Sequence, residues 1–267
     1  LQIRGTCKAH SDCEHAFHVV GRGHHTLIRN NHISDFNAHI KVNGLNGDWP
    51  DHGQLAFNTL TNSAVRNTAN PVVPLDLVGA SHWRVTDNLV TNFVKGSGNQ
   101  VSYGLFMKGA GEGGRIERNL VVCTPAGMSQ PGARVGISFG GGTTDPGSCR
   151  VDQCQIGEHF RGLAVHNVVA HCNDVGLDVN RSTDIALVHN TLAEGFSQEL
   201  NFDSVFESSM RLVGELASET SGKVNLLIEG KFGKLSSDQA TPLAVALTEL
   251  VTNAARHGLN NRGGLIA

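Results

Sequence analysis

A short pattern of apolar and polar positions recurs along the first two hundred residues. An apolar residue is followed by two or three polar residues, then an Asn, then a second apolar pair. The pattern occurs at 27–33, 85–90, 116–121, 165–169 and 187–192. Asn167 and Asn190 are 23 residues apart, whereas Asn88 and Asn119 are 31 apart. The pattern therefore predicts an internal repeat with insertions in individual turns.

A second pattern precedes the first by 11 or 12 residues and alternates apolar and polar side chains. It occurs at 40–42, 75–77, 105–107, 137–139 and 177–179. Strands this short bury little in hairpins, but similar turns stacked about 4.8 Å apart pair each strand with its copies above and below. The alternation predicts a continuous aliphatic core, with Lys41, Asp76 and Asp178 pointing outward.

The recurrent Asn has two explanations. Asn is common in turns, where its side chain bonds nearby backbone. It also tolerates left-handed backbone angles at a corner, and its amide can bond the equivalent Asn one turn away. Because it returns at the same place in the pattern, we predict a stacked Asn ladder. His166 and His189 lie beside it in equivalent positions, so we expect a stacked, solvent-facing pair rather than a metal site.

Residues 1–197 resemble the right-handed parallel β-helix proteins, a superfamily that includes pectate, alginate and chondroitin lyases. The stretch from Tyr103 to Asn119 carries the resemblance most clearly. It implies a mainly β solenoid that is secreted or periplasmic. The composition, with 32 Gly and 5% aromatic residues, suits many short strands and tight turns.

The resemblance also suggests chemistry. Lys108 matches the position of the catalytic Lys in the alginate and chondroitin lyases, and Arg115, Glu112 and Arg181 are candidates to project nearby. However, the basic residue expected one turn later is missing from 137–142, and no acidic cluster for calcium is evident. We therefore expect a carbohydrate-binding or polysaccharide-associated surface, with a uronate lyase using Lys108 and Arg115 as the alternative.

The Trp residues, a glycine run and the cysteines were also considered as functional or structural sites. Trp49 and Trp83 could stack on sugar rings, fill a corner or cap an end, and the glycines at 140–142 are expected to form a turn. Six cysteines all precede residue 175. Their even number favours disulfides and an oxidising compartment; buried free thiols and metal or redox chemistry are the alternatives. A net charge of −3 gives no reason to expect nucleic acid, and no apolar run is long enough to span a membrane.

The residues from 198 to 267 change character and predict a small α/β fragment. Val224 to Ile228 reads as a strand, and a later helix has an apolar face at Leu243, Leu247, Leu250, Val251 and Ala254. Its polar residues Glu249, Asn253 and His257 repeat at i, i+4 and i+8, so they share one helix face.

The segment from 247 to 258 resembles the N-box of sensor histidine kinase ATPase domains, and residues 200–259 as a whole resemble the start of such a domain. By that resemblance, Asn253 would ligate the magnesium that bridges the ATP phosphates, Glu249 would orient a water near the metal, and His257 would face the phosphates. The later glycine-rich boxes are not in this sequence, so we expect a truncated, inactive segment and no required cofactor. A kinase segment belongs in the cytoplasm and a disulfide-rich β-helix outside it, which indicates a chimeric junction near residue 198.

Overall fold

The computed structural model describes two parts of the chain, which form separate compact units, Leu1–Gly195 and Phe196–Ala267. In the first unit it describes residues 1–124, 132–142 and 144–193. In the second it describes 200–203, 206, 224–227, 229–235, 243, 246–247, 250–251, 254, 259 and 264–266. Each unit is considered by itself.

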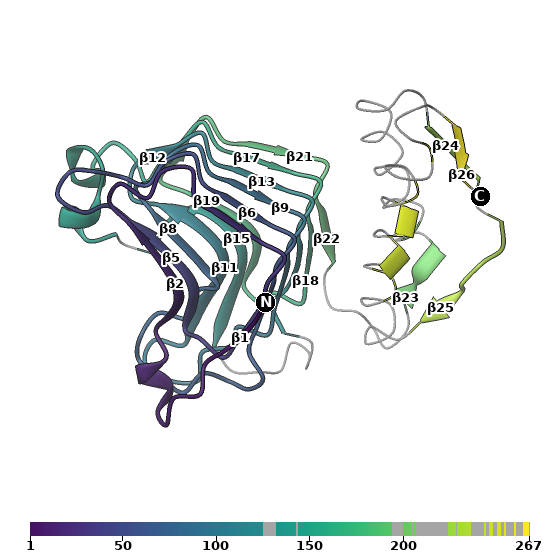
Figure 1. The fold of residues 1–267 in the computed structure, drawn as a ribbon, viewed down its shortest axis with the longest axis horizontal. Helices are drawn as coiled ribbons and strands as arrows, with labels where there is room; N and C mark the ends of the chain where they lie inside the picture. Colours follow the sequence, from purple (N-terminus) through teal and green to yellow (C-terminus); the bar gives the residue numbers. More distant parts are fainter. Residues whose placement is uncertain are drawn as a thin grey trace. The chain divides into compact units, whose positions relative to one another are not determined.

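The first unit is mainly β and is built from parallel sheets (Figure 1). Sheet A contains β1 (Gln2–Arg4), β4 (His32–Ser34), β7 (Thr59–Thr61), β10 (Leu89–Thr91), β14 (Leu120–Val122), β18 (Val168–Ala170) and β22 (Thr191–Ala193), in that order. Sheet B contains β2 (His15–Val20), β5 (Ala38–Asn43), β8 (Leu75–Val78), β11 (Val101–Lys108), β15 (Ala133–Gly140) and β19 (Val175–Asn180). Sheet C contains β3 (Leu27–Arg29), β6 (Gln54–Ala56), β9 (Arg84–Thr86), β13 (Arg115–Glu117), β17 (Leu163–Val165) and β21 (Ala186–Val188).

The chain visits these sheets in a fixed order. Each pass, which we call a coil, gives one strand to sheet B, then one to sheet C, then one to sheet A. A smaller sheet of β12 (Gly111–Glu112), β16 (His159–Phe160) and β20 (Ser182–Thr183) forms at one corner. The short 3-10 turns are η1 (His10–Asp12), η2 (Pro146–Ser148) and η3 (Asp152–Cys154). The predicted repeat of short stacked strands is confirmed.

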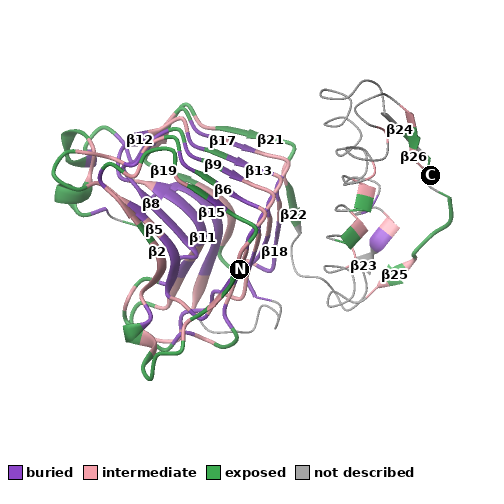
Figure 2. Cartoon of the chain, viewed as in Figure 1, coloured by how far each residue is buried: buried purple, intermediate pink, exposed green. Residues whose placement is uncertain are grey.

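The core of the first unit lies between the three sheets. Ile40, Leu75, Leu105 and Ile137 are register partners in sheet B, and each is at most 1% exposed. Figure 2 shows buried stretches in the neighbouring strands β8, β11 and β15 of this sheet. Trp83 is fully buried in this core, and its indole N–H donates to Pro50 O at 2.6 Å. Trp83 is therefore a core residue and is not available to a sugar.

The predicted Asn ladder is confirmed. Amide Nδ2 atoms donate to the Oδ1 atom of the Asn in the next coil at 2.9–3.0 Å, through Asn31, Asn58, Asn88, Asn119, Asn167 and Asn190. The left-handed backbone conformation was predicted for the ladder Asn, and this is wrong by one position. The residue before each ladder Asn adopts it, for example Asp87 at φ 58° and His166 at φ 58°. The rings of His166 and His189 stack at 5.5 Å, as expected.

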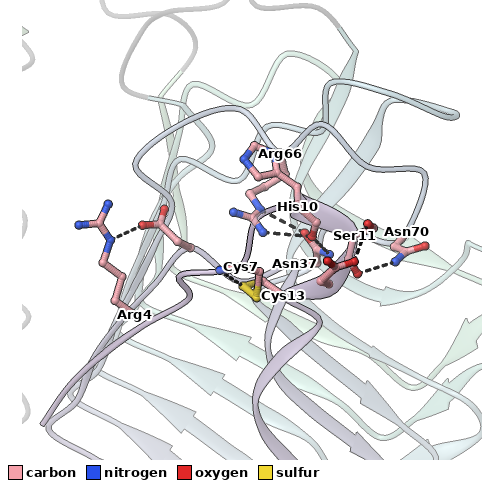
Figure 3. The surroundings of a disulfide bond; sticks show 10 residues. Arg4, Cys7, His10, Ser11, Cys13, Asn37, Arg66 and Asn70 are labelled. Atoms are coloured by element: carbon pink, nitrogen blue, oxygen red, sulfur yellow. Dashed lines mark hydrogen bonds and ion pairs between the residues drawn. A yellow bond between two sulfur atoms is a disulfide. The ribbon is translucent and has the colours of Figure 1, made fainter.

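All six cysteines form disulfides: Cys7–Cys13, Cys123–Cys172 and Cys149–Cys154. Figure 3 shows the first of them, which closes the loop that carries η1. The backbone oxygen of His10 in this loop accepts hydrogen bonds from Asn37 at 2.7 Å and from Arg66 at 3.3 Å, both from later coils. The disulfide interpretation of the cysteines is confirmed.

Among the described residues of the second unit, there are two short strand pairs. β23 (Leu200–Asn201) is antiparallel to β25 (Lys234–Leu235), and β24 (Val224–Leu226) is parallel to β26 (Gly264–Ile266). Phe202 and Phe206 are buried against Leu235, Leu243, Leu247 and Val251. The apolar helix face is thus confirmed for Leu243, Leu247 and Val251. Leu250 is 64% exposed, so its predicted place on that face is wrong.

Candidate functional site

Lys108 lies at the end of β11, on the outer face of sheet B. The outward positions of this sheet place Lys41 beside Asp76, and Asp76 beside Phe106. Lys41 Nζ lies 2.5 Å from Asp76 Oδ2, and Lys108 Nζ lies 3.8 Å from Asp76 Oδ1. Two ammonium groups from different coils thus converge on one buried carboxylate.

Two aromatic side chains, Phe106 and Tyr103, lie next to this pair of cations. Lys108 Nζ lies 4.5 Å from the centre of the Phe106 ring, and Tyr103 stacks on Phe106 at 4.2 Å. Gly142 covers both rings, because a Cβ built there would lie 3.1 Å from Phe106 and 3.3 Å from the Tyr103 hydroxyl. Burial, and then the charges of Asp178 and Asp174, raise the pKa of Tyr103.

The charges of the three side chains in this cluster do not balance. Asp76 is 5% exposed and faces both Lys41 and Lys108. Two positive charges therefore face one negative charge within this cluster, and the next carboxylate on the same column is that of Asp178.

The other predicted catalytic residues have their own partners. Arg115 lies on β13 in sheet C, and its Nε is 2.5 Å from Glu117 Oε1. Glu112 pairs with His82 and Arg161, and Arg181 pairs with Glu158. Within the described residues, Arg115 shares no ion pair with Lys108 or Asp76. Lys108 and Arg115 therefore belong to different sheets and different charge clusters.

A long loop, residues 141–157, lies beside the site and was not anticipated from the sequence. Arg150 in this loop makes a two-pronged ion pair with Asp51 at 2.7 and 2.9 Å, and also donates to Gly79 O at 3.2 Å. Its backbone N–H donates to Gly109 O, the residue after Lys108. The loop thus ties the end of β11 to two earlier coils.

Trp49 lies in the same region, against the glycines that end two strands of sheet B. A Cβ on Gly44 or Gly79 would come within 2.5 Å of the indole ring. The Arg150 guanidinium lies 6.0 Å from that ring. Glycine at both strand ends is the one sequence signal that could have located Trp49.

The predicted nucleotide residues Glu249, Asn253 and His257 lie outside the described residues. Their neighbours Leu247, Val251 and Ala254 are described and are partly buried. In the described portion of the chain, no group of three or more His, Cys, Asp or Glu side chains is arranged to hold a metal ion. None of the described helices is long and apolar enough to cross a membrane.

Comparison with known proteins gives one kind of relative. A segment of 83 residues is 37% identical to the sensor histidine kinase PdtaS of Mycolicibacterium smegmatis, covering 31% of this chain and 16% of the relative. The PdtaS of Mycobacterium tuberculosis is 34% identical over 82 residues, again 16% of its length. The chain therefore spans about a sixth of these relatives and contains a kinase-related segment. No family model matches the chain, and no solved structure matches it.

Proposed function

We propose that the C-terminal unit is part of the nucleotide-binding region of a sensor histidine kinase. The similarity to PdtaS carries this proposal, and the spacing of Glu249, Asn253 and His257 on one helix face supports it. The amide oxygen of Asn253 would ligate magnesium, Glu249 would orient a water near it, and His257 would face the phosphates. Magnesium would neutralise the phosphate charge of bound ATP.

Calorimetric titration of the full chain with ATP tests this proposal. We expect binding that requires magnesium and that weakens about tenfold or more in Asn253→Ala, since one metal ligand is lost. Asn225→Ala is the matched control, because Asn225 lies exposed on β24. The proposal fails if ATP does not bind, or if the two variants bind it equally well. Autophosphorylation is not expected in either case.

We further propose that the N-terminal unit is a right-handed parallel β-helix that binds an anionic polysaccharide. The three parallel sheets and the Asn ladder support the fold. The cluster of Lys41, Asp76 and Lys108 supports the ligand, because it offers excess positive charge beside aromatic rings. Carboxylate groups on a sugar chain suit such a surface. Phe106 is buried beneath it and supports Lys108 from below, so the ammonium groups rather than the aromatic rings would contact the sugar.

Affinity electrophoresis in gels containing polygalacturonate, alginate or neutral dextran tests this ligand class. We expect retardation by the acidic polymers only, and its loss in the double variant Lys41→Met with Lys108→Met. Lys8→Met is the control for a simple change of charge, because Lys8 is exposed in the η1 loop. Equal retardation of all variants would refute the assignment. Absorbance from unsaturated uronates, abolished by Lys108→Ala, would instead support the lyase alternative.

The two proposals imply different compartments. Disulfides persist outside the cytoplasm, which supports a secreted or periplasmic setting for the first unit, whereas a kinase segment works inside the cell. We therefore propose that the junction near residue 198 is a fusion of unrelated pieces. Sequencing the gene across this junction in its source DNA shows whether the junction exists in nature. An uninterrupted natural reading frame would refute a fusion made by engineering or by faulty assembly of the sequence, and would leave genome rearrangement as its origin.

A further inference from the structure

Two arginines lie side by side on the outer face of sheet C. Arg84 on β9 and Arg115 on β13 are register partners, and both side chains are exposed. Figure 1 shows their strands next to each other in this sheet. The residues that follow them, Val85 and Ile116, point inward and are fully buried. Both arginines therefore belong to one outward column, on neighbouring strands about 4.8 Å apart.

Arg115 has a partner of its own, whereas Arg84 has none among the described residues. Glu117 is 5% exposed and accepts from Arg115 Nε at 2.5 Å. Arg118 Nη1 lies 3.4 Å from Glu117, and Arg118 also makes a two-pronged ion pair with Asp87. No residue that the structure describes pairs with the Arg84 side chain. Three guanidinium groups thus share two carboxylates, and the excess positive charge lies at Arg84.

The neighbours of Arg84 in the sheet carry no negative charge. Its register partner on the side away from Arg115 is Gln54. The residues two positions away along the chain are His82 and Thr86. Like charges directly opposite each other on adjacent strands destabilise a sheet. Sheet C therefore holds two guanidinium groups next to each other without supplying an anion of its own between them.

We propose that Arg84 and Arg115 form a binding site for a phosphate or sulfate group. Such a group has at least three terminal oxygens, so it can accept from two guanidinium groups at once. A carboxylate has two oxygens, and a single guanidinium fork occupies both of them. Glu117 meets Arg115 through Nε, so the Nη groups of Arg115 have no hydrogen-bond partner among the described residues. The bound anion also removes the repulsion between the two arginines.

This site does not depend on the proposed polysaccharide surface. That surface is the cluster of Lys41, Asp76 and Lys108 on sheet B, whereas Arg84 and Arg115 lie on sheet C. Lysine ammonium groups act as point charges, whereas a guanidinium group has a planar fork that matches the oxygens of a phosphate group. A phosphate or sulfate group reaches the arginine pair as a free ion or as an ester on a sugar. Failure of one site would leave the other untouched, because no residue belongs to both.

NMR titration of the full chain, with ¹⁵N-labelled arginine, tests the site. Arg84→Lys and Arg115→Lys assign the two Nε–H signals. We expect both signals to move with inorganic phosphate or sulfate, and acetate at the same ionic strength to bind about tenfold or more weakly, because it engages one fork only. Glucose 6-phosphate and glucose 6-sulfate distinguish the sources. Esters that bind as tightly as the free ions assign the site to a sugar, whereas binding of the free ions alone assigns it to inorganic phosphate or sulfate.

The variant Arg84→Lys separates the guanidinium fork from its charge. The dissociation constant for phosphate, followed at the Arg115 signal, should rise about tenfold, because Lys keeps the charge and loses the fork. Arg22→Lys is the matched control, since Arg22 is exposed, lies outside sheet C and pairs with Asp48. Unchanged signals from the other arginines report that each variant is folded. The proposal is overturned if phosphate and sulfate move neither signal, if acetate binds as tightly as they do, or if Arg84→Lys and Arg22→Lys bind phosphate equally.

Discussion

Replacing Asn119 by Ala should destabilise the N-terminal unit far more than the same change at Asn31. Asn119 is 2% exposed and lies in the middle of the ladder. Its Oδ1 accepts the backbone N–H of Asn88 at 3.0 Å and the Nδ2 of Asn88 at 2.9 Å. Its own Nδ2 donates to Val85 O at 2.9 Å and to Asn167 Oδ1 at 3.0 Å.

The cost follows from what the Ala would leave behind. The backbone N–H of Asn88 would lose its acceptor inside the core, and a buried polar group left without a partner costs about 1–3 kcal/mol. The other lost bonds add about 1 kcal/mol between them, since Asn88 Nδ2 keeps Leu55 O and Thr86 O as acceptors. We therefore expect a loss of about 2–4 kcal/mol. Among the described residues, none donates to Asn31 Oδ1, so Asn31→Ala should cost about 1 kcal/mol or less.

Thermal unfolding followed by tryptophan fluorescence measures this difference in the right unit, because both Trp residues lie in residues 1–195. For a unit of this size, the expected losses correspond to a fall in Tm of about 5–15 °C for Asn119→Ala and a few degrees for Asn31→Ala. Equal shifts for the two variants would refute the idea that a continuous ladder, rather than each Asn alone, stabilises the corner.

Three further changes test other parts of the structure. Burial lowers the pKa of His159 to about 3 and that of His39 to about 4. Below pH 6.5 the unfolded chain therefore binds more protons than the folded unit does. The unit should lose stability as the pH falls from 6.5 towards 4. In His159→Gln, the fall of Tm over that pH range should be smaller; an unchanged fall would contradict the cause. Gly79→Ala should lower the free energy of unfolding by about 2 kcal/mol or more, because φ is +74° and the new Cβ would meet the Trp49 ring. Urea unfolding measures this loss. Gly47→Ala is the control for backbone strain alone, since Gly47 is exposed, has φ +83° and has open space around a Cβ. Asp76→Asn should lower the free energy of unfolding by about 1–2 kcal/mol in the same assay, because Lys41 and Lys108 would then face each other without a carboxylate between them. An unchanged free energy of unfolding would show that water already screens the two charges.

The coils could be predicted from the sequence because each one repeats the same local constraints. Inward positions such as Ile40 and Leu75 must be apolar in every coil, and the corner must carry an Asn whose amide reaches the next coil. The left-handed residue was misplaced by one position because several residue types adopt it here, including Asp87, Arg118 and His166. No single residue type marks that backbone position.

The loop at 141–157 could not be predicted, because its contacts are not local. Arg150 pairs with Asp51, 99 residues earlier in the chain. Nothing in the residues around Arg150 identifies that partner, and insertions of different length separate the coils. Glu249, Asn253 and His257 are the opposite case, because their predicted nucleotide role rests on a local i, i+4 and i+8 spacing that is visible in the sequence.

The outer face of sheet B shows why this fold is easier to read than its function. Stacking requires apolar residues only at the inward positions, so the residue type at an outward position is free to change from coil to coil. One outward column consists of Lys41, Asp76, Phe106, Ser138 and Asp178. Lys41 and Asp76 are 35 residues apart, yet register places them in contact. A binding surface on such a sheet runs across the strands and not along the sequence. Its chemistry therefore becomes visible only when the coils are aligned, and the converging charges of Lys41 and Lys108 at Asp76 make this column the first place to look for a ligand.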